Sequence, residues 1–225
     1  FFPSEKILLT GNPVRQSLLD NQITRETAAS AFGFNPNLKT VLVLGGSLGA
    51  RTINQTLAAG LALMKAHPEV QFIWQTGKIY IDQVKAAITA FTGEAVRNAR
   101  VGSIPNLYVT DFIKNMNNAY TLADLVISRA GAGSISEFCL LGKPVILVPS
   151  PNVAEDHQTK NALALVNKDA ALYVKDAEAQ EKLLDTALET VADDELLKQL
   201  SINIAKLALP DSARIIAEEV LKLIK

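Results

Sequence analysis

Two glycine-rich segments carry the residues best suited to chemistry, and each follows an apolar run of the kind that forms a buried strand. The segment Gly131–Glu137 reads Gly-Ala-Gly-Ser-Ile-Ser-Glu and comes after Leu125–Ser128. A junction of strand, glycine turn and helix directs several backbone N–H groups and the positive end of the helix dipole at one point, which favours a phosphate. Glu137, one turn into the helix, is placed to accept hydrogen bonds from a sugar diol. The working hypothesis is a nucleotide-binding turn.

The other segment, Gly45–Gly49, follows the apolar run Thr40–Leu44 and precedes a helical pattern that begins near Thr52. Ser47 could donate its hydroxyl to a phosphate oxygen, or it could cap the N-terminus of that helix. The turn could equally be a tight connection between strand and helix. Phosphate binding is therefore one of two open interpretations.

The spacing of the glycines argues against two common nucleotide motifs. Gly45–Gly49 lacks the G-x-G-x-x-G fingerprint of dinucleotide binding, and it lacks the Gly-Lys-Ser/Thr of a P-loop. The segment Gly131–Glu137 has Ser136 where the last glycine of the fingerprint belongs. The strands that follow the two turns end in Gln75 and in Pro149-Ser150, not in the acid that binds a nicotinamide cofactor's ribose. Classical NAD binding is disfavoured on both counts.

Several other polar residues admit two interpretations each. Ser134 and Glu137 fit a capping box, which competes with ribose binding for the carboxylate. Gln158 and Asn161 are three residues apart and share one face of a predicted helix, where amides suit the hydroxyls of a neutral sugar. The alternative for this pair is a solvated helix face. The segment Asp111–Ile113 follows a strand and could form a wall against which a base lies.

The composition excludes several classes of function. Of the 225 residues, 48% are hydrophobic and 20% charged, and the net charge of −1 lacks the basic footprint of a protein that binds nucleic acid. The single cysteine, Cys139, excludes an internal disulfide and a cysteine-cluster metal site. The histidines, His67 and His157, show neither triad nor metal-ligand spacing. No apolar run is long enough to span a bilayer. Because the sequence begins with Phe1 and not with Met, we expect a fragment of a longer protein.

Strands that alternate with helices would position these residues. The predicted strands are apolar throughout, which is typical of parallel strands buried on both faces. The pattern predicts an α/β fold with a doubly wound, Rossmann-like parallel sheet, in which ligands bind outside the carboxyl ends of the strands. We expect one domain over residues 1–225, with a short extra strand at Lys6–Thr10. Three helices are expected to close the chain, at about 178–191, 193–207 and 211–224.

Five segments, in order, resemble the carboxyl-terminal half of the MurG family of bacterial glycosyltransferases. They are Gly11–Arg15, Gly45–Arg51, Thr110–Ile113, Arg129–Glu137 and His157–Ala162. Members of that family add N-acetylglucosamine to the lipid-linked muramoyl-pentapeptide precursor of peptidoglycan. The resemblance implies one half of a GT-B fold. Residues 1–15 would link to a missing amino-terminal domain, and the terminal helix at 211–225 would pack on that domain.

The resemblance also implies roles for individual residues toward UDP-N-acetylglucosamine. Arg15 and Ser47 would lie along the diphosphate or the sugar, and Ile113 would hold the uracil through its backbone. Gln158 and Asn161 would contact the hydroxyls of N-acetylglucosamine. Glu137 would bind the ribose diol. The loop and helix start around the diphosphate and ribose would comprise Ala132, Gly133, Ser134, Ile135, Ser136 and Glu137.

The chain departs from the family pattern at three places. Leu48 stands where Gln is frequent, and Gly131–Ser134 replaces a loop of the Gly-Ala-Leu-Thr type. His157-Gln158 replaces a Gln-Gln pair. At Gly133, Ser134 and His157 we therefore expect contacts through the backbone and not through side chains.

The implied reaction is an inverting displacement that needs no metal and no other cofactor. Its base would lie in the missing amino-terminal domain, so we expect no catalytic residue in this chain, which would bind the donor without turnover. The lipid-linked acceptor would bind the missing domain, with peripheral contact at the cytoplasmic face of the bacterial cell membrane. Two alternatives stay open. One is a non-hydrolysing UDP-sugar epimerase-like domain, which needs catalytic acids and a histidine in its cleft, and the other is a binding-only Rossmann module.

Overall fold

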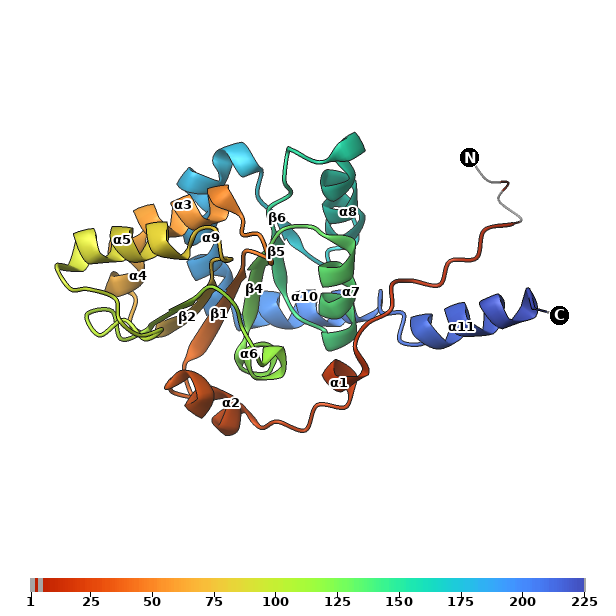
Figure 1. The fold of residues 1–225 in the computed structure, drawn as a ribbon, viewed down its shortest axis with the longest axis horizontal. Helices are drawn as coiled ribbons and strands as arrows, with labels where there is room; N and C mark the ends of the chain where they lie inside the picture. Colours follow the sequence, from red (N-terminus) through yellow and green to blue (C-terminus); the bar gives the residue numbers. More distant parts are fainter. Residues whose placement is uncertain (1–2, 4–5, 225) are drawn as a thin grey trace.

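A six-stranded parallel sheet forms the centre of the molecule in a computed structural model that describes residue 3 and residues 6–224 (Figure 1). The strand order is β3-β2-β1-β4-β5-β6. The strands are β1 (Lys39–Leu44), β2 (Val70–Gln75), β3 (Leu107–Thr110), β4 (Leu125–Ser128), β5 (Val145–Leu147) and β6 (Leu172–Tyr173). Because β2 and β3 lie on one side of β1 and β4 lies on the other, the winding direction reverses between β1 and β4. The predicted doubly wound α/β fold is confirmed.

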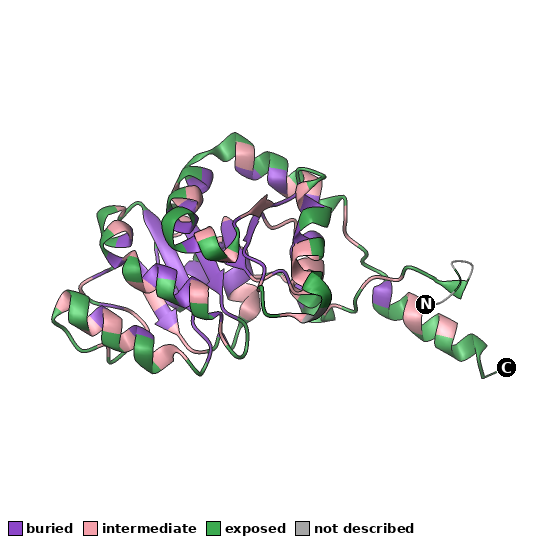
Figure 2. Cartoon of the chain, turned by 90° about the horizontal axis from the view of Figure 1, so that it is seen from above, coloured by how far each residue is buried: buried purple, intermediate pink, exposed green. Residues whose placement is uncertain are grey.

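Helices cover both faces of the sheet. The helices of the described chain are α1 (Gln16–Leu19), α2 (Arg25–Phe32), α3 (Arg51–Ala59), α4 (Leu61–Ala66), α5 (Ile81–Thr92), α6 (Met116–Leu122), α7 (Ala132–Leu141), α8 (His157–Val166), α9 (Ala179–Ala192), α10 (Asp194–Ala205) and α11 (Ser212–Lys222), of which α11 lies off the sheet (Figure 1). Two short 3-10 turns, η2 (Ala154–Asp156) and η3 (Asp176–Glu178), precede α8 and α9. Figure 2 shows the sheet buried between these exposed helices.

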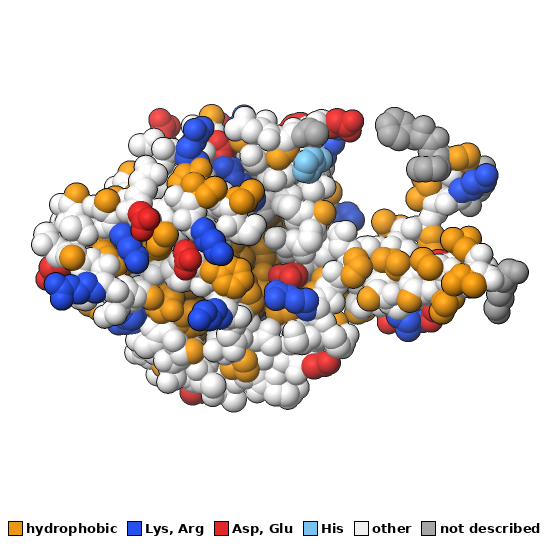
Figure 3. All heavy atoms as spheres, viewed as in Figure 1, with side chains coloured by type: hydrophobic (Ala, Val, Ile, Leu, Met, Phe, Trp, Pro, Cys, Tyr) orange, Lys and Arg blue, Asp and Glu red, His pale blue; other side chains and the backbone are white. Residues whose placement is uncertain are grey.

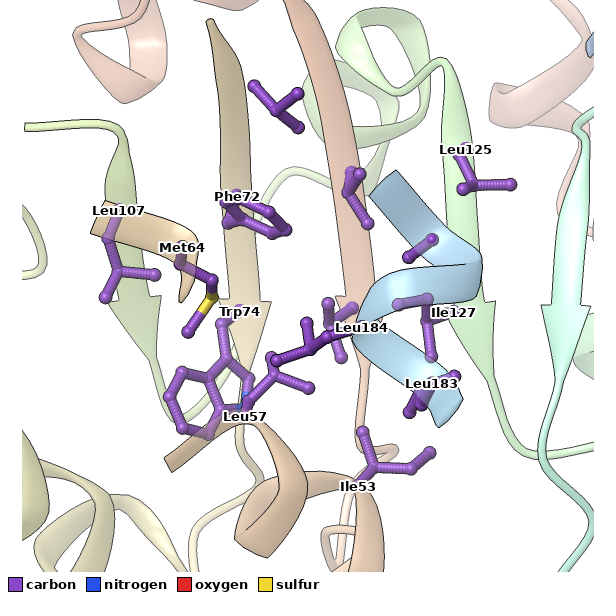
Figure 4. Close-up of a cluster of buried hydrophobic side chains, with 14 of the residues drawn as sticks. Ile53, Leu57, Met64, Phe72, Trp74, Leu107, Leu125, Ile127, Leu183 and Leu184 are labelled. Atoms are coloured by element: carbon purple, nitrogen blue, oxygen red, sulfur yellow. The ribbon is translucent and has the colours of Figure 1, made fainter. Parts of the chain in front are cut away.

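The alternation of side chains along β1 divides the core into two layers. Val41 and Val43 join the layer under α3, α4, α5 and α9, whereas Leu42 and Leu44 join the layer under α2, α6, α7 and α8. Trp74 lies fully buried in the first layer, where its indole N–H donates to the Asn54 side chain at 2.8 Å (Figure 4). Burial on both faces explains why these strands are almost entirely apolar.

Local signals set helix ends where the sequence predicts them. The Thr24 hydroxyl accepts from the Thr27 N–H at 3.3 Å at the start of α2, and Gly33 ends that helix in the left-handed conformation. The three closing helices are α9, α10 and α11, each within two residues of its predicted limits. The starts of α2 and α10 follow from side-chain capping, since Asp193 accepts from the Leu196 N–H at 2.9 Å, and this chemistry is local in sequence.

The predicted strand at Lys6–Thr10 is wrong. In the described part of the chain this segment forms no strand, and Ile7, Leu8 and Leu9 are exposed. The segment runs out of the globular body (Figure 1), so it has no neighbouring strand with which to form a ladder. Its apolar residues are therefore explained neither by sheet pairing nor by the core.

Helix α11 also extends away from the body, beside the amino-terminal segment (Figures 1 and 2). Ser212 is its buried residue, whereas Val220, Leu221 and the C-cap Leu223 are exposed. Figure 3 shows hydrophobic side chains along the visible face of this helix. The predicted link at 1–15 and helix at 211–225 include residues 1–2, 4–5 and 225, which lie outside the described residues. None of the described helices is long and apolar enough to cross a membrane.

The two extensions leave the body at one place. Gly11 has a φ of +78° and lies so close to the start of α11 that a Cβ there would come within 2.6 Å of the Ser212 hydroxyl. Only glycine fits this close approach with a positive φ. The amino-terminal segment is also tied to α7, because the Asn12 amide donates to the Ser136 hydroxyl at 3.0 Å.

Candidate functional site

The sheet brings the two glycine turns side by side at its carboxyl edge. Strands β1 and β4 are parallel neighbours, and Leu44 pairs with Ser128 as the last residue of each strand. The turns that follow, Gly45–Gly49 and Arg129–Gly131, therefore leave the sheet at the same level. This is the point where the winding direction reverses, which is where open α/β sheets bind ligands.

A cavity of about 310 Å³ lies between the two turns. Five of the residues that the sequence predicts as binding residues line it, namely Arg15, Ser47, Ile113, Ser134 and Glu137. They come from α1, the first turn, the loop after β3 and the first turns of α7. Residues far apart in sequence thus converge on one hollow.

Helix α7 presents free amides toward this hollow. Its N-cap is Gly131, and the Ile135 N–H makes the first intrahelical bond, to the Gly131 carbonyl at 3.0 Å. The N–H groups of Ala132, Gly133 and Ser134 thus have no acceptor within the helix. A Cβ at Gly131 or Gly133 would meet no described atom within 4 Å, so the space before the helix is open. The arrangement suits an anion.

The capping box at Ser134 and Glu137 is excluded. The helix begins at Ala132, two residues before Ser134, and no side chain of the described residues caps it. Ser134 is therefore inside the first turn, and its N–H points toward the amino end of the helix, where Glu137 does not reach it. The carboxylate is used elsewhere.

Glu137 is held by a tyrosine that the sequence analysis missed. The Tyr120 hydroxyl donates to Glu137 Oε2 at 2.7 Å, while Glu137 Oε1 lies 3.5 Å from an Arg15 guanidinium nitrogen. Burial raises the pKa of Tyr120, and the Glu137 charge raises it further, so the phenol stays protonated and remains a donor. Tyr120 therefore fixes Glu137 Oε2, and Oε1 faces the Arg15 guanidinium.

The glycine turn Gly45–Gly49, which is the first of the two glycine turns, is held by Gln75, a buried residue at the end of β2. Its amide oxygen accepts from the Gly46 N–H at 3.0 Å, and its amide nitrogen donates to the Gly46 carbonyl at 2.9 Å. The same nitrogen donates to the Asp111 carbonyl at 2.8 Å. Gln75 therefore fixes the turn to the loop after β3. Gln75 stands where a nicotinamide-binding protein would have an acid, and here it holds the glycine turn in place.

The Ser47 side chain is exposed and does not cap α3. Ala50 is the N-cap of that helix, with no side-chain hydrogen bond among the described residues. Nearby, Gly49 has a φ of +88°, and a Cβ there would lie 2.5 Å from the Thr76 carbonyl oxygen. Gly49 thus packs tightly against Thr76, as a short connection between strand and helix requires. Ser47, two residues earlier, lines the cavity.

The loop after β3 separates two cavities. Ile113 is buried and Phe112 is 55% exposed, and both line the 310 Å³ cavity and a larger neighbour of about 910 Å³. The larger cavity also reaches Ser47 and Lys78. The wall predicted at Asp111–Ile113 therefore stands at the edge of the site.

Ile135 and Ser136 lie on another side of α7. Ser136 accepts from Asn12 and donates to the Ala132 carbonyl at 3.0 Å, and both residues line a separate cavity that Leu9 also borders. Successive residues of a helix turn by about 100°, so consecutive positions cannot all face one ligand. The structure therefore separates these two from Ser134 and Glu137, which line the 310 Å³ cavity.

The amides of Gln158 and Asn161 hold loops at the carboxyl edge. The Gln158 side-chain oxygen accepts from the Ser150 N–H at 2.9 Å, and the Asn161 side-chain nitrogen donates to the Ala130 carbonyl at 3.1 Å. Both residues are partly buried. The face they share is turned toward the ends of β4 and β5, not toward solvent, although neither residue lines the 310 Å³ cavity.

Arg129 was also missed, although a charged residue directly after a buried strand is a signal that sequence alone offers. Its guanidinium donates to the Val148 and Pro149 carbonyls at 3.0 and 3.1 Å and pairs with Asp176. No group of three or more His, Cys, Asp or Glu among the described residues could hold a metal ion.

Comparison with known proteins identifies related sequences. The family model described as "Glycosyltransferase family 28 C-terminal domain" matches residues 40–215. A relative from Bacteroides fragilis is 68% identical over 223 residues, which is 99% of this chain and 56% of the relative. One from Bacteroides thetaiotaomicron is 66% identical and covered to 57%. Both are named UDP-N-acetylglucosamine--N-acetylmuramyl-(pentapeptide) pyrophosphoryl-undecaprenol N-acetylglucosamine transferase. The chain thus spans little more than half their length.

Solved structures share the fold. MurG from Acinetobacter baumannii superposes with a TM-score of 0.69 at 24% identity, over 91% of this chain and 55% of that one. The UDP-GlcNAc 2-epimerase from Neisseria meningitidis, solved with UDP-GlcNAc bound, gives 0.64 at 19% identity, over 98% and 56%. At these identities the likeness establishes the fold and leaves the reaction open.

Proposed function

Since the chain belongs to the glycosyltransferase family 28 carboxyl-terminal domain family, we propose that it is the half of a MurG-type N-acetylglucosaminyltransferase that binds UDP-N-acetylglucosamine. The observation that carries the proposal is the start of α7, where free helix amides stand next to the oriented carboxylate of Glu137. A nucleoside diphosphate offers both an anion for the amides and a ribose diol for the carboxylate.

The donor would lie across the switch point of the sheet. Its diphosphate takes the amides of Ala132 to Ser134, with Arg15 as a counter-charge. The ribose diol donates to Glu137, and the uracil lies against the backbone at Ile113. The sugar extends past Ser47 toward the helix face that carries Gln158 and Asn161. Ile135 and Ser136 support the helix from its other side.

The reaction would proceed by inversion at the anomeric carbon. A base on another domain takes the proton of the acceptor hydroxyl, whose oxygen forms a bond to that carbon. The bond between the carbon and the UDP oxygen breaks, and UDP leaves with the electron pair. The negative charge that develops on the diphosphate is stabilised by the α7 amides and Arg15. This chain by itself binds the donor and does not complete the transfer.

Titration by calorimetry tests the donor site. We expect UDP-N-acetylglucosamine to bind more tightly than UDP-glucose, and NADH to bind weakly or not at all. Arg15→Gln should weaken UDP binding, while Arg97→Gln, an exposed control, should leave it unchanged. Tightest binding of NADH would contradict the proposal. Equal affinity for both UDP sugars would remove the acetamido specificity.

Turnover assays separate the remaining alternatives. The chain alone, given UDP-N-acetylglucosamine and a lipid-linked acceptor, should form no product. Conversion of the donor to its C2 epimer would favour the epimerase-like domain, whose fold this chain shares. Donor binding without transfer by any longer form of the protein would favour the binding-only module.

The apolar extensions are proposed to contact a second domain that binds the lipid-linked acceptor at the cytoplasmic face of the membrane. Leu8 and Leu9, with Val220 and Leu221 of α11, are exposed in this chain and have no role in its core. Leu221→Gln should leave the unfolding temperature of the chain unchanged. In a protein that carries both domains it should lower that temperature, and no change there would contradict the contact.

A further inference from the structure

The carboxylate of Asp176 joins the two glycine turns from a distant part of the sequence. Its Oδ2 accepts from the Thr52 hydroxyl at 2.8 Å, and its Oδ1 pairs with Arg129. Thr52 is the second residue of α3, which follows the first turn, and Arg129 is the first residue of the second turn. Asp176 itself lies in η3, outside the five segments that resemble a known family. One side chain therefore joins the helix that follows the first turn to Arg129 in the second turn.

The contact is built into the body of the protein. The Arg129 and Asp176 side chains are only 18% and 19% exposed, so solvent screens their pairing less than it screens a surface ion pair. The Arg129 guanidinium is also held by the carbonyls at the end of β5. Its donors are thus directed at the protein, even though Arg129 lines the cavity.

The start of α3 is held by this contact through the Thr52 hydroxyl. Among the described residues no side chain caps α3, and the first turn is otherwise fixed by Gln75 from the side of β2. Gln75 and Asp176 therefore hold the turn and the helix that follows it from two directions. Removing either should let the first turn move relative to α7.

We propose that Asp176 is a positioning residue of the nucleotide-sugar site, which sets the spacing between the two glycine turns through Thr52 and Arg129. This rests on the proposed function insofar as the turns are the walls of the donor site. A diphosphate that bridges them needs its partners within a few tenths of an ångström, so a small shift costs affinity. Asp176 would act without touching the ligand.

The test uses four variants of the chain. Asp176→Ala removes both contacts, and Thr52→Val removes one hydroxyl while keeping the ion pair. Thr52→Ser keeps the hydroxyl and should behave as wild type. Glu178→Gln removes a charge from the same 3-10 turn, where Glu178 pairs with Lys182 on the surface, and serves as the matched control.

Two readouts are needed, because a purely structural role would lower the unfolding temperature alone. Calorimetry with UDP, well below that temperature, should show affinity reduced about tenfold in Thr52→Val and more in Asp176→Ala, as expected from loss of hydrogen bonds to a charged group. Hydrogen exchange without nucleotide should become faster at residues 46–51 and 130–134 in both variants. Thr52→Ser and Glu178→Gln should match the wild type in both measurements.

Several results would overturn the proposal. They are unchanged exchange at both turns in Thr52→Val, an equal effect of Glu178→Gln, or tighter UDP binding in Asp176→Ala, which would mean that Asp176 withholds Arg129 from the nucleotide. If the wild-type chain binds no UDP, the proposed function fails. The exchange data, which use no ligand, then decide separately whether Asp176 spaces the turns. Thr52→Val keeps the test decisive should Asp176→Ala not fold.

Discussion

Tyr120 donates its hydroxyl to Glu137 at 2.7 Å, and this contact joins α6 to the first turns of α7 at the edge of the cavity. Tyr120 is 3% exposed, so the phenol is fixed by the surrounding core. Phe138, the residue after Glu137, packs against the Tyr120 ring edge to face, with the two ring centroids 6.2 Å apart. The carboxylate is therefore oriented before any ligand arrives.

Tyr120→Phe should weaken UDP binding by about 1 kcal/mol, because Glu137 Oε2 loses the donor that orients it. Calorimetry measures the affinity, and thermal unfolding should show a smaller loss, since the ring stays packed. Tyr173→Phe, in β6, provides a control whose affinity should not change. Unchanged UDP affinity in Tyr120→Phe would mean that the tyrosine does not orient the site.

Glu137→Gln should weaken UDP binding by about 1–3 kcal/mol, the usual loss for a hydrogen bond to a charged group. The amide oxygen can still accept from Tyr120, so the unfolding temperature should change little. Glu181→Gln, an exposed residue of α9, is the control. If unfolding temperature fell while affinity held, the carboxylate would serve α7 stability and not the ribose.

Gln75→Met should lower the free energy of unfolding by about 1–3 kcal/mol, since Gly46 and Asp111 lose buried hydrogen-bond partners. It should also weaken UDP binding, because the first turn is released. Gln71→Met is the matched comparison, from the amino end of the same strand, where Gln71 is buried and bonded to Asn35 and Thr40. That variant should lose stability and keep affinity. Equal affinity losses in the two variants would contradict a specific role for Gln75.

Lys143 should make stability depend on pH in the alkaline range. Burial lowers its pKa from the ordinary 10.5 to about 8, while Asp124 raises it and Arg25 lowers it. Between those values the unfolded chain binds more protons than the folded one, so stability rises as pH rises from about 8 toward 10.5. Below about pH 8 the ammonium is charged in both states, and its burial cost is fully present.

The measurement for Lys143 is the difference in unfolding free energy between wild type and Lys143→Met across this range. The variant's relative advantage should be largest near neutral pH and shrink toward pH 10.5. Lys198→Met, at an exposed position of α10, is the surface control. A flat profile for Lys143→Met would contradict the lowered pKa.

The fold and half of the candidate site follow from signals that are local in sequence. Apolar runs predict the strands, and the glycine segments predict both turns. The parallel sheet then explains why the turns meet, because all carboxyl ends share one edge.

The contacts that orient the site could not be predicted in this way. Tyr120 reaches Glu137 through the packing of α6 against α7, and Asp176 reaches Thr52 across 124 positions of sequence. Each contact joins side chains from two different elements, which meet only once the chain is packed. No residue spacing within a single helix or strand indicates such a contact. The strand expected at Lys6–Thr10 failed for a related reason, since apolar residues predict burial but do not say against what.

The meeting of both chain extensions at Gly11 has a mechanical consequence. A domain carried on the amino-terminal segment and on α11 would be attached to this body at a single place, where Gly11 touches the start of α11. Translation would then be restrained, and rotation about that hinge would be the soft motion. Such a rotation would open or close the carboxyl edge of the sheet, where the cavity lies, by changing few backbone dihedrals. The fixed orientation of Glu137 and the mobile joint would then lie in separate parts of the chain.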